Sequence, residues 1–536
     1  MYGRRRGNRF SLYAPDELAA KVDKAIENTR LLEESIMEAG ERYTRALKRE
    51  RVQKQQSKKK GRNRDMVVRR SQQRSIYEEI ARNVLPDYAE MKWEDWMVEA
   101  DRVLNDEELV EIVADALKKR RPKSGKLGRP STPAEVVLRM MVLKHVRNWS
   151  YEGLVREVRA NLAYREFTRI GVGRVPDDKT MVKLGLVLGP EVVKQMHKRI
   201  VAKAKEEKVV TGRKMRLDTT VTEANIHYPT DSGLLGDGVR VITRLVSRIE
   251  QKLGQAGVKT RNRMKSVQHR MIEIGKAASQ RGEKAKEKRK EIYVKLMRTT
   301  RRIITEATAA IEEANKKIRE EGDRRKKEAV EKLIEKATAM VVLTEMVLKQ
   351  TRVRVMKGET HYEQKLVSVF EKGTEVIRKG KAAKPTEFGK MVKIQEAENQ
   401  IITDYEVYDS RPADQDLLMP SIEEHVRIFG RAPGLVAADA GFHSTANMKG
   451  AAEAGIKKVA VPGRGGRSKG KKKKKERWFR EGQRWRVGCE GRISVLKRRS
   501  GLARSRYKGT NGMKRWVGLG VIADNLISMG RYLSSG

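Results

Sequence analysis

The sequence predicts a multidomain α/β protein whose α/β core is interrupted by a long all-helical insertion and preceded by helical regions. Three observations predict this class. The run "MRLDTTVTE" at 215–223 alternates apolar and polar residues as a strand does. Pro229 and Pro385 bracket 155 residues without proline, and the Lys, Glu and Ala content of that stretch favours long unbroken helices. A period of two then returns at 388–408.

Composition narrows the class of partner. The 536 residues give room for roughly two to four domains. Lys and Arg number 119 against 71 Asp and Glu, a net charge of +48, which points to a polyanion. Nucleic acid is the leading candidate, because neutralised phosphates release counterions, and an anionic membrane surface is the weaker alternative. No run of 18 apolar residues exists, so we expect a soluble intracellular protein with no spanning helix.

Cysteine content excludes two classes of site. Cys489 is the single cysteine of the chain, so neither an internal disulfide framework nor a cysteine-based zinc site is possible.

Residues 1–130 are predicted to form a basic helical arm. Residues 45–75 hold thirteen Lys or Arg and two acids, typical of a solvated arm or of one lying along DNA, and the global charge favours DNA. Gly128-Arg129-Pro130 resembles the core of a minor-groove hook, which makes Arg129 a candidate DNA contact. A plain linker explains these three residues equally well.

Residues 131–205 are predicted to form a helical, helix-turn-helix-like DNA-binding domain. One helix begins at Pro133, directly after Thr132, and two more are expected over 150–160 and 178–188. A plain helical bundle fits the same pattern, because no sequence rule fixes the crossing angle of the helices.

Residues 206–235 are predicted to be the first part of the core, with a strand ending near Asp218. Alternation places Met215 and Leu217 on one face of this strand and Arg216 and Asp218 on the other. An aspartate at a strand end is usually a turn or cap residue. The alternative is that Asp218 binds a metal ion, which requires acidic partners elsewhere in the chain.

Residues 236–384 are predicted to be a helical insertion domain, and 385–536 the second part of the core. An even number of long helices would return the chain to the point at which it left the sheet. The second part is expected to contain, in order, strands at 388–396 and 400–408, a helix to about Phe429 with Asp414 as its N-cap, a strand at 435–438 ending on Asp439, a helix capped by Ser444 and closed by Gly455, a strand in "KKVAVPG", and a helix bearing Glu490.

This element order is that of a ribonuclease-H-like α/β domain. In such a domain two parallel strands lie side by side, and we expect their ends to bring Asp218 and Asp439 together while a helix delivers Glu490. Three neighbouring carboxylates repel strongly unless divalent cations neutralise them. Oxygen ligands select Mg²⁺ or Mn²⁺. Two such ions, about 4 Å apart, would support phosphoryl transfer.

Four separated motifs resemble those of the DDE transposases of bacterial insertion sequences, within the broad group related to the IS-four and IS-five types and closest to the one called ISNCY. The segment "YEGLVREVRANLAYREF" resembles the helical domain that precedes the core in those enzymes. Together these similarities cover roughly 131–235 and 385–536. The motifs are "LDTTVTEANIHYPTDSGLL" at 217–235, "TDYEVYDSRPADQDLLMP" at 403–420, "LVAADAGFHS" at 435–444, and "CEGRISVLKRRSGL" at 489–502 with "GMKRWVGLGVIADNL" at 512–526.

The resemblance implies functions for individual residues. It makes Asp218, Asp439 and Glu490 the catalytic acids and the ligands of two Mg²⁺ or Mn²⁺ ions. Many relatives carry a Tyr–Arg–Glu–Lys helix signature, and Arg486, Glu490 and Lys497 fit its spacing, which puts them on one helical face. Gln483 occupies the tyrosine position, a departure that puts the usual phosphate contact in doubt. An ordinary surface face of ion pairs is the plain alternative.

The resemblance also implies partners and place of action. A transposase binds insertion-sequence ends, hydrolyses the end phosphodiester and joins the 3′-hydroxyl to target DNA; the partners are double-stranded DNA and a second copy in a homodimer, with no membrane, in the bacterial cytoplasm at the nucleoid. A non-catalytic DNA-binding protein and a nuclease without strand transfer are the rivals. The candidate DNA contacts are Arg129, His443, Lys471, Lys472, Lys473, Arg486, Arg492 and Lys497.

Other polar residues near the motifs rank lower. Glu223 and Asp231 follow Asp218 and would at most assist it, and Asp409 stands near the second strand of the hairpin. His227 and His443 each follow an acid motif, where a lone histidine is more often structural than a phosphate contact.

Overall fold

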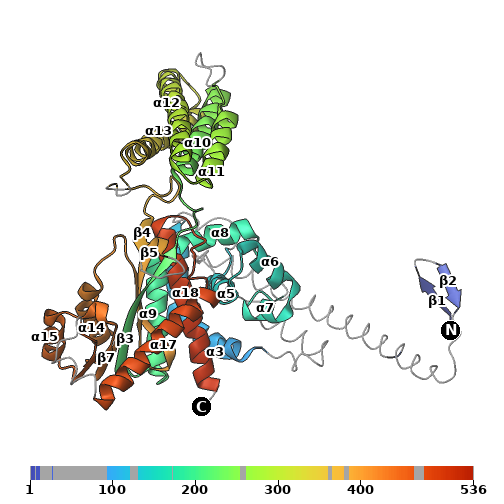
Figure 1. Ribbon diagram of the computed structural model, residues 1–536. Coiled ribbons are helices and arrows are strands. Elements are labelled where there is room, and N and C mark those ends of the chain that lie inside the picture. Colours follow the sequence, from blue (N-terminus) through green and yellow to red (C-terminus); the bar gives the residue numbers. More distant parts are fainter. Residues whose placement is uncertain are drawn as a thin grey trace. The chain divides into compact units, whose positions relative to one another are not determined.

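The computed structural model describes residues 2–5, 8–11, 27, 93–120, 131–171, 173–253, 261–359, 362, 365–378, 385–463 and 476–534. The chain divides into two compact units, which are described separately (Figure 1). Unit one comprises Met1–Thr211, Ala397–Thr403 and Gly518–Gly536, and unit two comprises Gly212–Glu396 and Asp404–Val517.

Unit one is helical apart from a short hairpin of β1 (Tyr2–Arg5) and β2 (Asn8–Ser11), which stands where the sequence predicts helix. The helices predicted from Pro133, over 150–160 and over 178–188 are confirmed as α5, α6 and α8, and α7 and α9 were not foreseen. The helices are α3 (Asp95–Leu104), α4 (Glu107–Arg120), α5 (Ala134–Val146), α6 (Tyr151–Ala160), α7 (Leu162–Phe167), α8 (Asp178–Val187) and α9 (Pro190–Glu206).

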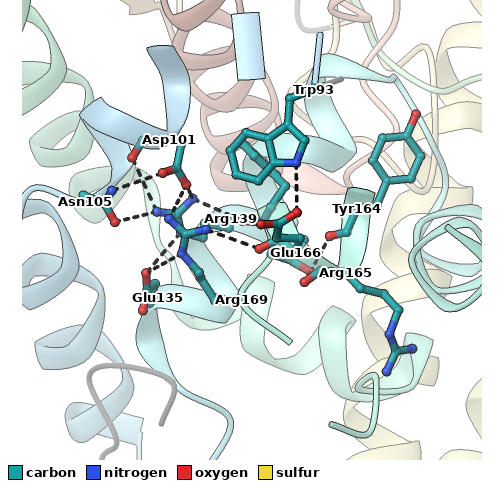
Figure 2. A network of polar contacts seen from close by, with 11 residues as sticks. Trp93, Asp101, Asn105, Glu135, Arg139, Tyr164, Arg165, Glu166 and Arg169 are labelled. Atoms are coloured by element: carbon teal, nitrogen blue, oxygen red, sulfur yellow. Dashed lines mark hydrogen bonds and ion pairs between the residues drawn. The ribbon is translucent and has the colours of Figure 1, made fainter. Parts of the chain in front are cut away.

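A buried polar network joins three of these helices (Figure 2). The Arg139 guanidinium of α5 is fully buried and donates to Asp101 at 2.7 Å, to Asn105 at 3.0 Å and to the Phe167 carbonyl at 3.1 Å. Arg169 contacts Asp101 as well and lies 3.5 Å from Glu135. Burial lowers the pKa of Arg139 to about 10, which still leaves it charged at neutral pH. The network therefore fixes α3, α5 and the end of α7 through paired buried charges.

Unit two contains a mixed six-stranded sheet. Strands β4 (Glu375–Arg378), β5 (Thr386–Glu396), β3 (Lys214–Glu223), β7 (Leu435–Ala437) and β8 (Lys458–Ala460) lie in that order, and β6 (Ile402–Val407) also pairs with β5. The β3–β5 pair is antiparallel, whereas β7 runs parallel to both β3 and β8. The predicted hairpin and the later strand pair are thus confirmed as β5, β6, β7 and β8.

Helices cover both faces of the sheet (Figure 1). Side chains of β3 and β7 point alternately to the two faces, so each face has its own packing partners. Met215 and Leu217 pack in one cluster with Leu418 and Ile422 of α14 (Leu418–Phe429) and with α15 (Thr445–Glu453). On the other face Ala437 packs with Phe479 of α17 (Arg477–Arg499). The last helix, α18 (Gly509–Ser534), begins in unit two, and its residues from Gly518 on belong to unit one. Arg216 and Asp218 alternate with Met215 and Leu217, so they lie on the α17 face.

The insertion is an antiparallel bundle with a core of its own. Its four helices are α10 (Asp231–Leu253), α11 (Met264–Ala278), α12 (Glu283–Arg319) and α13 (Arg324–Arg352), the last followed by a π-helical turn at Val353–Lys357. One apolar cluster runs through all four helices and reaches Leu366 and Val369. The return of the chain to the sheet requires an even number of helices, and four meets this requirement.

Three boundaries differ from the sequence prediction. Helix α10 begins at Asp231, before the expected start of the insertion at 236. Strand β4 pairs with β5 although it lies inside the range assigned to the insertion, because four residues are too few to show a period of two. The prediction that Asp414 caps a helix is wrong: Ala413 holds the N-cap position of a 3₁₀ turn, Asp414–Leu417, and the Asp414 side chain makes no capping hydrogen bond. The N-cap assigned to Ser444 is confirmed, since its hydroxyl accepts from the Asn447 N–H.

Candidate active site

The pairing of β3 with β7 brings two of the expected acids to the same level of the sheet. Lys214, Met215 and Arg216 lie opposite Leu435, Val436 and Ala437, partners that always differ by 221 residues. Asp218 and Asp439 differ by the same number and continue these two strands on the α17 face. Parallel register therefore sets the two carboxylates side by side where β7 ends.

The pKa of Asp218 is raised, as expected for a buried carboxyl group with other acids nearby. Burial is the largest cause that raises its pKa, to about 6, and the nearby negative charges of Asp439 and Glu490 act in the same direction. The Thr219 N–H, which donates to Asp218 at 2.7 Å, and the positive charge of Arg486 oppose this rise. Asp439 and Glu490 therefore both lie within electrostatic reach of Asp218.

Asp439 is oriented by its own loop. Its Oδ1 accepts from the Gly441 N–H at 2.8 Å, which fixes the carboxylate at the start of the 3₁₀ turn Ala440–Phe442. On the opposite face of β3, the Thr219 hydroxyl donates to Asp414 at 3.1 Å. Sequence reasoning missed this contact, because it depends on the packing of the Asp414 turn against β3.

Glu490 and Arg486 form an ion pair on α17. Arg486 Nη1 lies 2.9 Å from Glu490 Oε1, and the side chains are 16% and 56% exposed. Glu490 is therefore more than half exposed and has Arg486 of its own helix as its ion-pair partner. Within the described ranges, no three His, Cys, Asp or Glu side chains are grouped closely enough to hold a metal ion.

Helix α17 is attached to the sheet beside Asp439. Gln483, at the position where relatives carry tyrosine, donates to the carbonyls of Ala438, at 3.2 Å, and of Ala460. These carbonyls lie at the ends of β7 and β8. A Cβ added to Gly482 would lie 2.7 Å from the Ala460 Cβ, so glycine lets the helix approach closely. Gln483 is thus a structural contact here, which the sequence signature did not reveal.

The remaining candidate DNA contacts lie in different surroundings. Lys497 Nζ lies 3.8 Å from Glu387, which is seven residues before Ile394, the partner of Asp218 on β5. Arg492 is only 4% exposed, so its role as a DNA contact stays a prediction that requires the side chain to become accessible. His443 is half-buried, directly after the Asp439 turn. Four others, Arg129, Lys471, Lys472 and Lys473, lie outside the described residues, as do 45–75.

The lower-ranked polar residues have other partners. Glu223 contacts Arg504 at 3.2 Å, Asp409 contacts Lys514 at 3.2 Å, and buried Asp231 pairs with Arg354. His227 lies 2.8 Å from Asp237, and this hydrogen bond raises the pKa of the imidazole. These pairs satisfy the acids away from Asp218. Cys489 is fully buried, as a packed residue would be, and burial raises the pKa of its thiol.

Comparison with protein families decides the identity. Residues 93–184, which contain α3 to α8, match the transposase domain (DUF772), and residues 465–530, which contain α17 and most of α18, match the transposase DDE domain. The two matches support a DDE transposase of insertion sequences. Neither curated proteins nor solved structures give a match to this transposase.

The two matched regions fall on features already described. The first contains the Arg139 network of unit one, and the second contains Arg486 and Glu490 of the transposase's α17. Asp218 and Asp439 lie outside both matches. None of the helices in the described part of the transposase is long and apolar enough to cross a membrane.

Proposed function

We propose that this transposase cuts the phosphodiester at insertion-sequence ends and joins the freed 3′-hydroxyl to target DNA, with Asp218, Asp439 and Glu490 as the catalytic acids. The observation that carries the proposal is the parallel register of β3 and β7, which sets Asp218 level with Asp439 on the face covered by α17. Antiparallel β3 and β5 beside parallel β7 and β8 support a ribonuclease-H-like core.

The three carboxylates are suitable ligands for a divalent cation, and Asp218 and Asp439 already lie side by side. Among the residues that the structure describes, Asp218 has no cationic hydrogen-bond partner, and its raised pKa reflects charge that a cation would neutralise. Oxygen donors favour Mg²⁺ or Mn²⁺. Glu490, which is paired with Arg486, would complete the set by exchanging this pair for the cation. Bound there, two divalent cations would polarise the scissile phosphate and stabilise the leaving oxygen.

The side chains of the transposase would then bind the DNA and orient the acids. Arg486, released from Glu490, is placed to contact a DNA phosphate next to the acids. Asp439 is held by the Gly441 N–H, so it would bind with little loss of conformational freedom. The chain's net charge of +48 supplies the attraction for DNA, and a homodimer would hold both ends together.

Labelled transposon ends incubated with a target plasmid and Mg²⁺ test the proposal. The expected result is a joined product from the wild-type chain, and loss of both cleavage and joining with retained end binding in D218N, D439N and E490Q. Cleavage without joining would identify a nuclease, and binding without cleavage a non-catalytic DNA-binding protein. Either outcome would refute the strand-transfer function.

A further inference from the structure

Arg216 connects three elements beneath the candidate active site. It stands two residues before Asp218, on the same face of β3, and its side chain is 6% exposed. Its Nε donates to Glu396 of β5 at 3.0 Å, and Nη2 bonds the other oxygen of this fully buried carboxylate. Its Nη1 donates to the Trp485 carbonyl of α17 at 2.5 Å. One buried cation thus ties β3, β5 and α17 together.

The contact with α17 is close because the helix presents a ring and a glycine. The Arg216 guanidinium lies 4.9 Å from the centre of the Trp485 ring, a cation–π distance. A Cβ added to Gly488, one turn further along, would lie 2.4 Å from Arg216 Nη1. Any larger residue at Gly488 would have to push either the guanidinium or the helix away. The helix backbone therefore rests directly on Arg216.

The contact of Arg216 with α17 lies close in the chain to Glu490, the third acid. Arg486 follows Trp485 directly, and Glu490 lies five residues along the same helix. Gln483 fastens the preceding turn to the carbonyls of Ala438 and Ala460. Two contacts on neighbouring turns restrict sliding and rotation of the helix on the sheet, and they therefore restrict the position of Glu490 relative to Asp218 and Asp439.

Stability alone is a weak reason for this arrangement. Replacing a buried ion pair by apolar residues of similar volume is often neutral or stabilising, because burial of charge is costly. A fork of donors that satisfies a carboxylate and a helix carbonyl together adds directional precision instead. We propose that Arg216 is a positioning residue that sets the placement of α17, and with it the approach of Glu490 to the other two acids; this rests on the proposed function.

Cys489 offers a reporter that needs no catalysis. It is the single cysteine of the chain, is fully buried, and lies within electrostatic reach of Glu396, Asp218, Arg216 and Arg486. Its thiol can react with iodoacetamide only when α17 lifts from the sheet. The alkylation rate of the native protein, divided by the rate of the denatured chain, therefore measures how firmly α17 is held.

The test compares two double variants that each remove one buried ion pair from β5. R216M/E396M deletes the contact with α17 without leaving an unpaired charge. K393M/D404M is the matched control, because Lys393 and Asp404 pair at 2.8 Å, are both 7% exposed, and Lys393 lies on the sheet face opposite Glu396. R216K keeps the charge but not the planar fork, and it serves if R216M/E396M does not fold.

We expect R216M/E396M to melt cooperatively, to alkylate at Cys489 at least about tenfold faster than wild type, and to cleave ends about a hundredfold more slowly with end binding retained. The Mg²⁺ concentration for half-maximal cleavage should also rise. K393M/D404M should match wild type in alkylation rate, cleavage rate and Mg²⁺ requirement.

Two outcomes would contradict the positioning role of Arg216, and a third would separate it from the proposed function. Wild-type protection of Cys489 in R216M/E396M would show that Arg216 does not hold α17. A reactive thiol with normal cleavage would show that the placement of α17 does not govern the chemistry, and would overturn the positioning role. If wild type itself does not cleave, the proposed function fails, and the alkylation rates alone decide whether Arg216 holds α17.

Discussion

Replacing Asp218 by asparagine should destroy cleavage and yet stabilise the metal-free protein. A carboxyl whose folded pKa is raised contributes stability below its unfolded value, and this stability is lost as pH rises through the folded value. For Asp218 the window runs from the ordinary value of 3.8 to about 6. D218N removes the ionisation, so its advantage over wild type should appear across that window and be complete at pH 7.5.

The size of the effect follows from the same shift. A rise of about two pKa units corresponds to about 3 kcal/mol at 1.36 kcal/mol per unit. Local relaxation around a half-buried site reduces this, so we expect a gain of about 1–3 kcal/mol, or about 2–6 °C in the midpoint of a domain this large. The Thr219 N–H can still donate to the asparagine carbonyl oxygen, so that hydrogen bond is retained.

Thermal unfolding in EDTA at pH 4 and pH 7.5 gives the measurement. D218N should exceed wild type at pH 7.5 and match it at pH 4. E490Q is the matched control, because Glu490 is 56% exposed and paired with Arg486, and it should show no gain. Added Mg²⁺ should raise the midpoint of wild type more than that of D218N, since a cation that binds only the folded state stabilises it. Equal midpoints for D218N and wild type at pH 7.5 would refute the reasoning.

Three further predictions concern other parts of the chain. R139M leaves Arg169 as the one remaining arginine of the network beside Asp101 and Glu135, and this loss of a fully buried charge partner should cost about 3 kcal/mol in denaturant unfolding. R156M, at an exposed site, should change the free energy of unfolding by less than about 0.5 kcal/mol. Neutralising the basic residues of 45–75 or 469–475 should lower the slope of log affinity against log salt by roughly 0.9 for each phosphate that is no longer neutralised, and an unchanged slope would mean that these runs do not touch DNA. We expect the helical insertion to mediate assembly of the paired-end complex. Replacing 232–369 by a Gly/Ser linker removes the whole apolar cluster of the bundle, so light scattering on DNA ends should then show loss of this complex. Normal pairing and joining would assign the bundle another role.

The sequence by itself determined the order and type of most elements of the core. The alternation at 215–223 placed Met215 and Leu217 on one face of β3 and Asp218 on the other, because side chains of a strand point to opposite faces whatever it pairs with. Ser444 as N-cap and the helical character of the insertion follow from equally local signals, whereas the number of its helices, four, came from the structure. These patterns lie within one helical turn or one strand, so they can be recognised without knowing which other element the segment packs against.

Only the tertiary structure decided which residues of different elements meet. Three such contacts join segments that are far apart in the chain. They are the strand register that places Asp218 beside Asp439, the hydrogen bond of Thr219 with Asp414, and the hydrogen bond of Arg216 with α17. Periodicity states which face of an element is buried, but not against which partner or at what level along it. The pKa of Asp218 is likewise a property of the assembled site, because burial and the neighbouring acids that raise it exist only once β3, β7 and α17 have packed together.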